Sequence, residues 1–206
     1  MPLTKPTAAP AASAQQVSKP RNPATLKLKV YKYGEAVLRE KALPVAVVDD
    51  RLRKLADDMI DTMHDAKGVG LAAEQVGRTE RMCVIDIPEG CDEPEDEVFN
   101  APIAMPLRLF NPEIVAAEGS QRDKEGCLSF PNVGGSLTRA AQVTCQYLDE
   151  ENRPQMITAR GYLARAIQHE IDHLNGILYI DHMSAVERLA CAPKLKKLAK
   201  ANGGVR

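Results

Sequence analysis

The stretch QHEIDHLNGILYIDH, residues 168–182, constrains this chain most, because its metal-binding pattern works only on a helix. Helical positions i and i+4 share a face, so His169 and His173 would lie side by side and hold one ion. Glu170 would lie close enough to act on a bound water without being a ligand. Apolar residues at helical spacing turn the histidines toward a core: Leu163, Ile167, Ile171 and Leu174. The alternative is a chance match in an amphipathic helix, which would leave buried imidazoles in need of other partners.

The pattern supplies two ligands and a base but no third ligand, because Tyr179 stands where metzincin peptidases carry a histidine. Cys127, in EGCLSFPNVGG, is the strongest candidate, since it follows a glycine in a tight, extended stretch. The remaining candidates are weaker. Asp181 and His182 lie past the end of the helix and would have to turn back, Glu187 is better used as a helix cap, and His64 is expected to be partly exposed on an earlier helix. Among the cysteines, Cys83 and Cys145 are expected to be buried structural thiols, and Cys91 and Cys191 lie in the acidic loop and the basic helix.

The composition is that of a soluble globular domain. The chain has 206 residues, of which 44% are apolar and 27% charged, enough for one domain with a core. No run approaches the roughly 20 apolar residues that span a bilayer, and we expect no secretory signal at the N-terminus. Five scattered cysteines favour free thiols in a reducing compartment, or a metal or catalytic role for one of them.

Both ends of the chain are basic, although its net charge is only −1. Residues 1–34 contain six Lys or Arg and no acid, and residues 183–206 contain six against one acid. Such ends favour either contact with a polyanion or simple solubilisation. Residues 1–24, rich in Ala, Pro, Ser and Gln, are expected to form a disordered basic tail, with an organellar transit peptide as the alternative.

The order of expected elements predicts an α+β fold. Helices are expected from Asp49 or Asp50 up to Gly68, over residues 161–176, and over residues 184–200. The last helix has a Ser184–Glu187 capping box, and Pro193 would kink or break it. Strands are expected at residues 81–87, 107–119, 137–149 and 154–160, and residues 88–102 are expected to form a mobile acidic loop.

The segment GVGLAAEQVG, residues 68–77, fits the G-x-G-x-x-A fingerprint of dinucleotide sites. That fingerprint needs a strand before it and a helix after it, whereas here a helix precedes and a strand follows. A nucleotide site is therefore not expected. The glycines indicate either a close backbone approach, with Gln75 as an uncharged donor, or a plain helix end and turn.

Three motifs together resemble peptide deformylase: residues 68–75, GVGLAAEQ; residues 125–129, EGCLS; and residues 168–176, QHEIDHLNG. The resemblance covers about residues 27–183. It implies antiparallel sheets packed around a central helix that carries HExxH, with a helix on the N-terminal side and another at the C-terminus. The expected parts are a catalytic domain over residues 25–183 and a basic helix and tail over residues 184–206.

What the resemblance implies chemically is removal of the N-formyl group from formyl-methionine, with release of formate. Cys127, His169 and His173 would hold one divalent metal, Fe2+ by expectation, with Zn2+, Ni2+ or Co2+ able to substitute. Glu170 would act as the base and proton carrier. The Gln75 side chain and the Leu128 amide would stabilise the oxyanion.

The resemblance also implies how substrate binds. The peptide would pair as an added strand along Val69, Gly70 and the segment from Gly126 to Leu128. Residues before the helix histidines would form the methionine pocket, here Tyr162 and Ala166, with polar Arg165 a departure from the aliphatic residue of some members. An ion pair between Glu125 and Arg139 would brace the Cys127 segment. Some members carry a peptide-binding arginine downstream of the cysteine, but this chain has Val133, Gly134 and Gly135 there, so that contact is not expected.

The implied partners are formyl-methionyl nascent peptides and the ribosome, contacted through the C-terminal lysines, with no membrane and no sequence-specific nucleic acid. The lysines concerned are Lys194, Lys196, Lys197 and Lys200. The bacterial cytoplasm is the expected location, or an organelle if residues 1–24 are a transit peptide. The rival hypotheses are a zinc peptidase and an inactive, ribosome-associated relative. The sequence does not indicate a role for the acidic insertion at residues 89–106, or which side chains are preferred after the methionine of the substrate.

Overall fold

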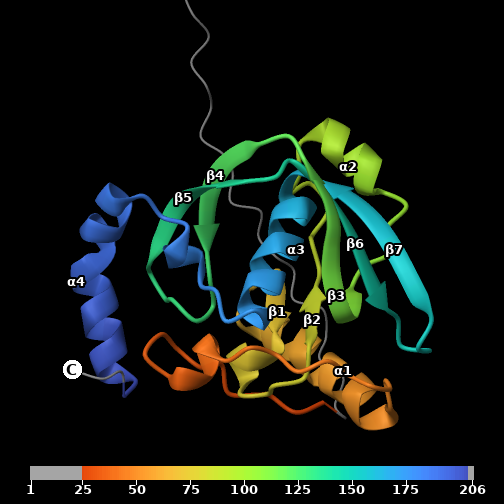
Figure 1. The fold of residues 1–206 in the computed structure, drawn as a ribbon, viewed down its shortest axis with the longest axis horizontal. Coiled ribbons are helices and arrows are strands. Elements are labelled where there is room, and N and C mark those ends of the chain that lie inside the picture. The colour runs from red at the N-terminus through yellow and green to blue at the C-terminus, as the bar shows by residue number, and fades with distance from the viewer. Residues whose placement is uncertain (1–24, 204–206) are drawn as a thin grey trace, which may run out of the picture.

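The computed structural model describes residues 25–203, which form helices and antiparallel sheets (Figure 1). The four α-helices are α1 (Asp50–Asp65), α2 (Pro94–Asn100), α3 (Gly161–Leu174) and α4 (Ala185–Ala201). The seven strands are β1 (Gly70–Ala72), β2 (Met82–Ile85), β3 (Leu107–Glu118), β4 (Gln121–Gly126), β5 (Gly134–Arg139), β6 (Gln142–Leu148) and β7 (Pro154–Arg160). Three short 3-10 helices complete the description: η1 (Ala36–Arg39), η2 (Ala73–Val76) and η3 (Tyr179–Asp181).

Two sheets surround α3. One has five strands in the order β1-β2-β3-β6-β7, and the other pairs β4 with β5. Every ladder is antiparallel. In Figure 1, α3 runs between the β4–β5 pair and the strands β3, β6 and β7. Its apolar side belongs to a core cluster with residues of the large sheet, among them Leu109, Val143 and Cys145. The predicted α+β fold around a central helix is therefore confirmed.

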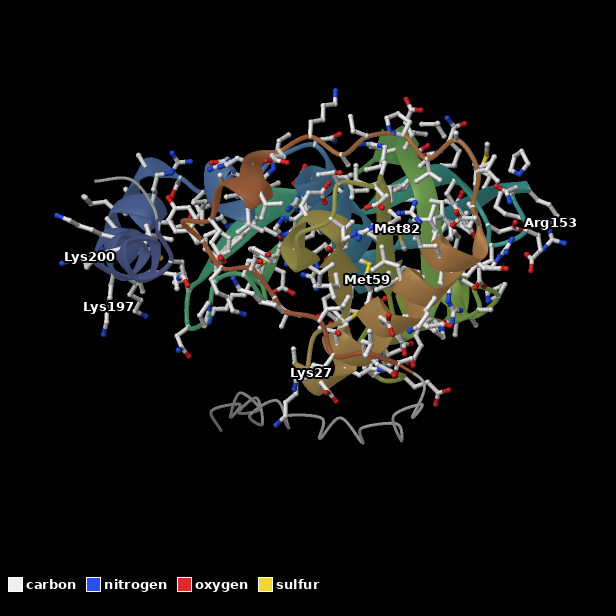
Figure 2. The ribbon with its side chains drawn as sticks, turned by 90° about the horizontal axis from the view of Figure 1, so that it is seen from below. Lys27, Met59, Met82, Arg153, Lys197 and Lys200 are labelled. Carbon is white, nitrogen blue, oxygen red and sulfur yellow. The ribbon has the colours of Figure 1, made fainter. Side chains whose placement is uncertain are left out.

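The helix α1 forms for the reasons that the sequence indicates. The Asp49 side chain accepts a hydrogen bond from the Leu52 amide at the start of the helix, as an N-cap does. The apolar stripe of α1 packs in a second cluster with β1 and β2. Figure 2 labels two fully buried members of this cluster, Met59 of α1 and Met82 of β2. Residues 68–70 follow shortly after the end of α1 and lie beside α3.

The expected strand at residues 137–149 is wrong as one element, because the chain leaves one sheet and enters the other inside it. Strand β5 ends at Arg139 and β6 begins at Gln142. The Gln168 side chain of α3 accepts from the Ala140 amide at 3.0 Å and donates to the Ala140 carbonyl at 3.1 Å. Those bonds replace ladder bonds at the break. Because they come from Gln168 on α3, the stretch LTRAAQV itself gives no local sign of the break.

Two further expectations need correction. Residues 88–102 are not simply a mobile acidic loop, because α2 begins there with Pro94 in its first turn and three acids at its positive end. The polar stretch QRDKEG forms β4, which the sequence does not predict because it has no apolar alternation. Both elements contact α3, α2 directly and β4 through its Glu125 and Asp123 side chains, so they matter for the site that α3 carries.

The C-terminal helix α4 begins at the expected capping box, in which the Ser184 hydroxyl accepts from the Glu187 amide. Pro193 lies inside the helix without ending it, so of the expected kink or break, the break does not occur. Leu195 is buried in a third cluster with Phe130 and Tyr179, so α4 is docked on the domain. Among residues 25–203, no helix is long and apolar enough to cross a membrane.

Candidate metal centre

The inner face of α3 carries the two histidines that its 3.6-residue repeat places one above the other. His169 and His173 are buried, and their ring centroids are 5.1 Å apart. Cys127 follows β4 and brings its Sγ to 3.2 Å from His173 Nε2. One ligand atom from each of these three residues lies within 4.8 Å of the others. A thiolate and two imidazoles converging in this way form a donor set suited to a divalent transition metal.

A chain of polar contacts behind His169 fixes its orientation. His169 Nδ1 lies 3.0 Å from the Glu125 carboxylate, which leaves Nε2 as the nitrogen available to a metal. Arg139 donates to both Glu125 oxygens, at 2.8 and 3.0 Å, and also contacts Asp172. Burial opposes the ionisation of Glu125, but hydrogen bonds from His169 and Arg139 lower its pKa to about 2. The expected Glu125–Arg139 pair is confirmed as a contact; its effect on turnover stays a prediction.

His173 is held in the neutral form that a metal ligand requires. Burial, followed by the neighbouring charge of His169, lowers the pKa of His173 well below its usual value. Its Nδ1 has no hydrogen-bond partner in the described part of the chain. A buried, neutral imidazole beside a thiol fits metal ligation better than a purely structural role.

Glu170 lies on the same helix, turned toward the glycine segment. A Cβ added at Gly70 would be 2.2 Å from Glu170 Oε1, so only glycine permits this close approach. The other carboxylate oxygen, Oε2, is buried without a partner among the described residues. Burial raises the pKa of Glu170 to about 7, the range in which a carboxyl group can both accept and return a proton.

Gln75 projects into the site from η2. Its side-chain oxygen accepts from the Ala72 amide, which fixes Nε2 as the donor. Nε2 lies 3.3 Å from Cys127 Sγ and 3.2 Å from Ser129 Oγ. The amide of Leu128, one residue after the cysteine, donates to no protein group in residues 25–203. The two donors expected at the oxyanion are thus brought to the same place as the three ligand residues.

A cavity of about 310 Å³ opens beside these groups. Its walls include all the residues expected to bind substrate, namely Val69, Gly70, Gly126, Tyr162 and Ala166, together with Arg165. The Arg165 guanidinium lies over the Tyr162 ring at 5.1 Å and pairs with Asp123. This stacking and pairing explain how a cation can line a cavity that is expected to take an apolar side chain.

The other candidate ligands lie elsewhere. Tyr179, at the metzincin position, is buried and donates its hydroxyl to the Val133 carbonyl at 3.0 Å. Each remaining carboxylate or histidine has another described partner: Asp181 pairs with Arg39, His182 contacts Asp172, His64 contacts Asp86, and Glu187 caps α4. All five cysteines are free thiols, and Cys83 and Cys145 are buried as expected.

The sequence reasoning missed an N-terminal segment that ties both halves of the site together. The Tyr31 amide donates to the Gln75 carbonyl at 2.7 Å, and the Tyr33 amide donates to the Ser129 carbonyl at 2.9 Å. Between them, Lys32 Nζ donates to the Leu128 carbonyl at 2.7 Å. The alternation in KLKVYKY, residues 27–33, is a signal of extended backbone that could have indicated this segment.

Glu74, next to Gln75, is a fully buried carboxyl group whose two oxygens have no partner among the described residues. Burial raises its pKa to about 8, from 4.5 in an exposed glutamate. Folding therefore takes up a proton between these pH values. The stability that this proton supplies is fully present below about pH 4.5 and is lost as the pH rises to about 8.

We predict that Glu74→Gln removes this pH dependence. Relative to the unchanged protein, the variant should gain roughly 1 kcal/mol in free energy of unfolding per pH unit between about pH 5 and 8. Urea unfolding of both proteins at several pH values measures the difference, in which titrating groups that do not interact with Glu74 cancel. A difference that stays constant with pH would contradict the prediction.

Comparison with known proteins identifies relatives over most of the chain. The polypeptide deformylase family profile matches residues 27–189. A peptide deformylase from Desulfitobacterium hafniense is 45% identical over 159 residues, which cover 77% of this chain and 96% of that protein. A peptide deformylase from Mesorhizobium japonicum is 46% identical over 167 residues, covering 81% of this chain and 89% of that one.

Solved structures agree with these sequences. A peptide deformylase from Legionella pneumophila has a TM-score of 0.73 at 38% identity, covering 88% of this chain and 100% of that chain. One from Synechococcus elongatus, in complex with actinonin, has a TM-score of 0.71 at 40% identity, covering 90% and 92%. The chain therefore belongs to the polypeptide deformylase family, hydrolases that remove the N-formyl group from nascent peptides.

Proposed function

We propose that this chain is a metal-dependent hydrolase of formyl-methionyl peptides, releasing formate and a free N-terminus. The observation that carries the proposal is the convergence of Cys127, His169 and His173. Two of these residues, Cys127 and His169, line the same cavity as Gln75 and Glu170. We further propose that residues 25–183 supply the catalytic domain, and that the enzyme acts in the bacterial cytoplasm, where formylated chains are made.

The metal would be held by Cys127 Sγ and one nitrogen from each of the two histidines, and we expect Fe2+, with Zn2+, Ni2+ or Co2+ able to substitute. The donors fit such an ion: a thiol, an imidazole oriented by Glu125, and a neutral imidazole. When bound, a divalent ion supplies Lewis acidity, which polarises the amide carbonyl and lowers the pKa of water. Three protein ligands leave room for solvent or substrate, as catalytic sites require.

Glu170 has the position and protonation behaviour of the proton carrier. As the carboxylate, it accepts a proton from the attacking water while the new C–O bond forms at the formyl carbon. As the acid, it returns that proton to the leaving nitrogen when the C–N bond breaks. The close contact with Gly70 supports this role, because it places Glu170 beside the strand along which substrate would lie.

Charge that develops on the formyl oxygen needs donors fixed in advance. We assign this task to Gln75 Nε2 and the Leu128 amide. Gln75 is suited to it, because Ala72 holds its oxygen and thereby aims its nitrogen at the Cys127 sulfur. The hydrogen bonds from the Tyr31 amide to the Gln75 carbonyl and from Lys32 Nζ to the Leu128 carbonyl support a rigid arrangement of both donors.

Substrate would enter as an extended strand, with the methionine side chain in the part of the cavity lined by Tyr162 and Ala166. Val69 and Gly70 on one side, and Gly126 on the other, would contact its backbone. Strand β1 is the edge of the large sheet, which leaves one side free for such pairing.

The direct test is formate release from formyl-Met-Ala-Ser under anaerobic conditions after iron has been restored. We expect formate and an unblocked peptide in equal amounts, and no cleavage of internal peptide bonds. Metal-loaded protein that releases no formate would overturn the proposal. Cleavage of internal bonds would instead support the zinc peptidase hypothesis.

The ribosome is the proposed partner of α4. Figure 2 shows Lys197 and Lys200 projecting from this helix into solvent, and Lys196 is also exposed. Because Leu195 packs in the core, charge substitution is a cleaner test than truncation. Replacing Lys196, Lys197 and Lys200 by glutamine should lower ribosome co-sedimentation at low salt roughly tenfold and spare hydrolysis of a free peptide. Unchanged co-sedimentation would reject docking through this helix.

A further inference from the structure

The cavity lies between two free sheet edges, and both of its walls begin with a lysine. One wall is the segment from Lys67 to Gly70, which leads into β1, the edge strand of the large sheet. The other wall runs from Lys124, in β4, to Leu128. A lysine at the start of each wall is a feature that the proposed chemistry does not use.

The two lysines lie at a distance from the reacting groups that a short stretch of peptide can span. Cys127, Gln75 and Glu170 mark the reacting end of the cavity. Lys124 lies three residues before Cys127, and Lys67 lies three residues before Gly70, which touches Glu170. At about 3.3 Å per extended residue, Lys124 in β4 is roughly 10 Å of chain away from Cys127, and Lys67, in the turn after α1, is at most about 10 Å away from Gly70. A substrate strand spans that distance with the two or three residues that follow its formyl group.

Both ammonium groups are available for a new ion pair. Lys67 and Lys124 are exposed, and neither forms an ion pair within residues 25–203. The acids beside them are already neutralised: Asp65 by Lys27, Asp123 by Arg165, and Glu125 by Arg139. Glu170 is buried at the opposite end of the cavity. The mouth of the cavity therefore presents net positive charge to the part of a bound peptide that extends out of the cavity.

We propose that Lys67 and Lys124 give this enzyme a preference for formyl-methionyl peptides with an acidic side chain at the second or third residue. The proposal rests on the proposed deformylase function and names the substrate class of that same site. The side chain of an exposed lysine reaches several ångströms along its wall. Because one lysine lies on each wall, an acidic side chain on either face of an extended peptide can meet a lysine.

The test compares kcat/KM for amide-capped peptides formyl-Met-Ala-Glu, formyl-Met-Ala-Gln and formyl-Met-Ala-Lys, and for the same three residues placed second. At low ionic strength, we expect Glu to exceed Gln by about threefold for each lysine, or roughly tenfold together. About 0.5 M salt should reduce this ratio toward one, because exposed charges are screened. The double variant K67Q/K124Q should also have a ratio near one.

Two further variants make the result specific. The control K41Q removes an exposed lysine outside the cavity and should keep the Glu-to-Gln ratio. The variant K67Q/K124E should reverse the preference, so that the Lys peptide exceeds the Gln peptide. Equal hydrolysis of all three peptides by the unchanged enzyme, or a ratio that survives in K67Q/K124Q, would overturn this inference alone. Failure to release formate from any peptide would overturn the proposed function together with it.

Discussion

Replacement of Glu170 by glutamine is expected to lower formate release from formyl-Met-Ala-Ser by about 10³-fold or more, with metal content unchanged. Glutamine keeps the size of the side chain and its place against Gly70 but cannot accept or return a proton. The metal ligands are other residues, so the substitution removes the proton carrier and leaves the Cys127, His169 and His173 group in place. The loss should appear in kcat, because the proton moves only during the reaction.

The measurement is kcat and KM for the peptide, with metal per chain determined on the same preparation. The matched control is Glu118→Gln, which removes an exposed carboxylate at the end of β3, remote from the cavity. It should leave both quantities unchanged. Near-normal kcat in Glu170→Gln with full metal content would show that another group carries the proton.

The parts of the fold that the sequence predicts are those with local causes. The Asp49 cap, the apolar stripe of α3 and the Ser184–Glu187 capping box each lie within one short segment, and the structure contains all three. The break at Ala140 is different, because its backbone partners come from Gln168, which is 28 residues away. Strand β4 is also non-local, since its polar residues pair only with β5.

The site divides in the same way. His169 and His173 are related by helical spacing, so their shared face follows from the sequence alone. The place of Cys127 depends on β4, which local patterns do not predict. The chemistry of its glycine-flanked segment made it the strongest candidate for the third ligand, and the family resemblance supported the same choice. The role of Lys32 had no sequence signal beyond alternation, because its contact with Leu128 spans 96 residues. Long-range contacts of this kind need a fold before they can be inferred.

Replacement of Cys127 by serine is expected to weaken metal binding by more than about 100-fold, the upper end for residues that only orient a ligand. The hydroxyl of serine stays protonated at neutral pH and is a poor ligand for a soft or borderline metal, whereas the thiolate binds it directly. The histidines alone leave a two-ligand site on α3. Formate release should fall with metal content, and the fold should persist, because Cys127 is only partly buried at the edge of the third cluster.

Metal per chain after anaerobic loading with iron, and separately with zinc or nickel, measures the effect directly. Cys91→Ser is the matched control, because Cys91 is an exposed thiol outside the ligand group, and it should keep full metal content and turnover. Circular dichroism and the urea midpoint of both variants separate lost ligation from unfolding. Full metal content and native turnover in Cys127→Ser would mean that the third ligand is another group, and would undo the assignment on which the proposed function rests.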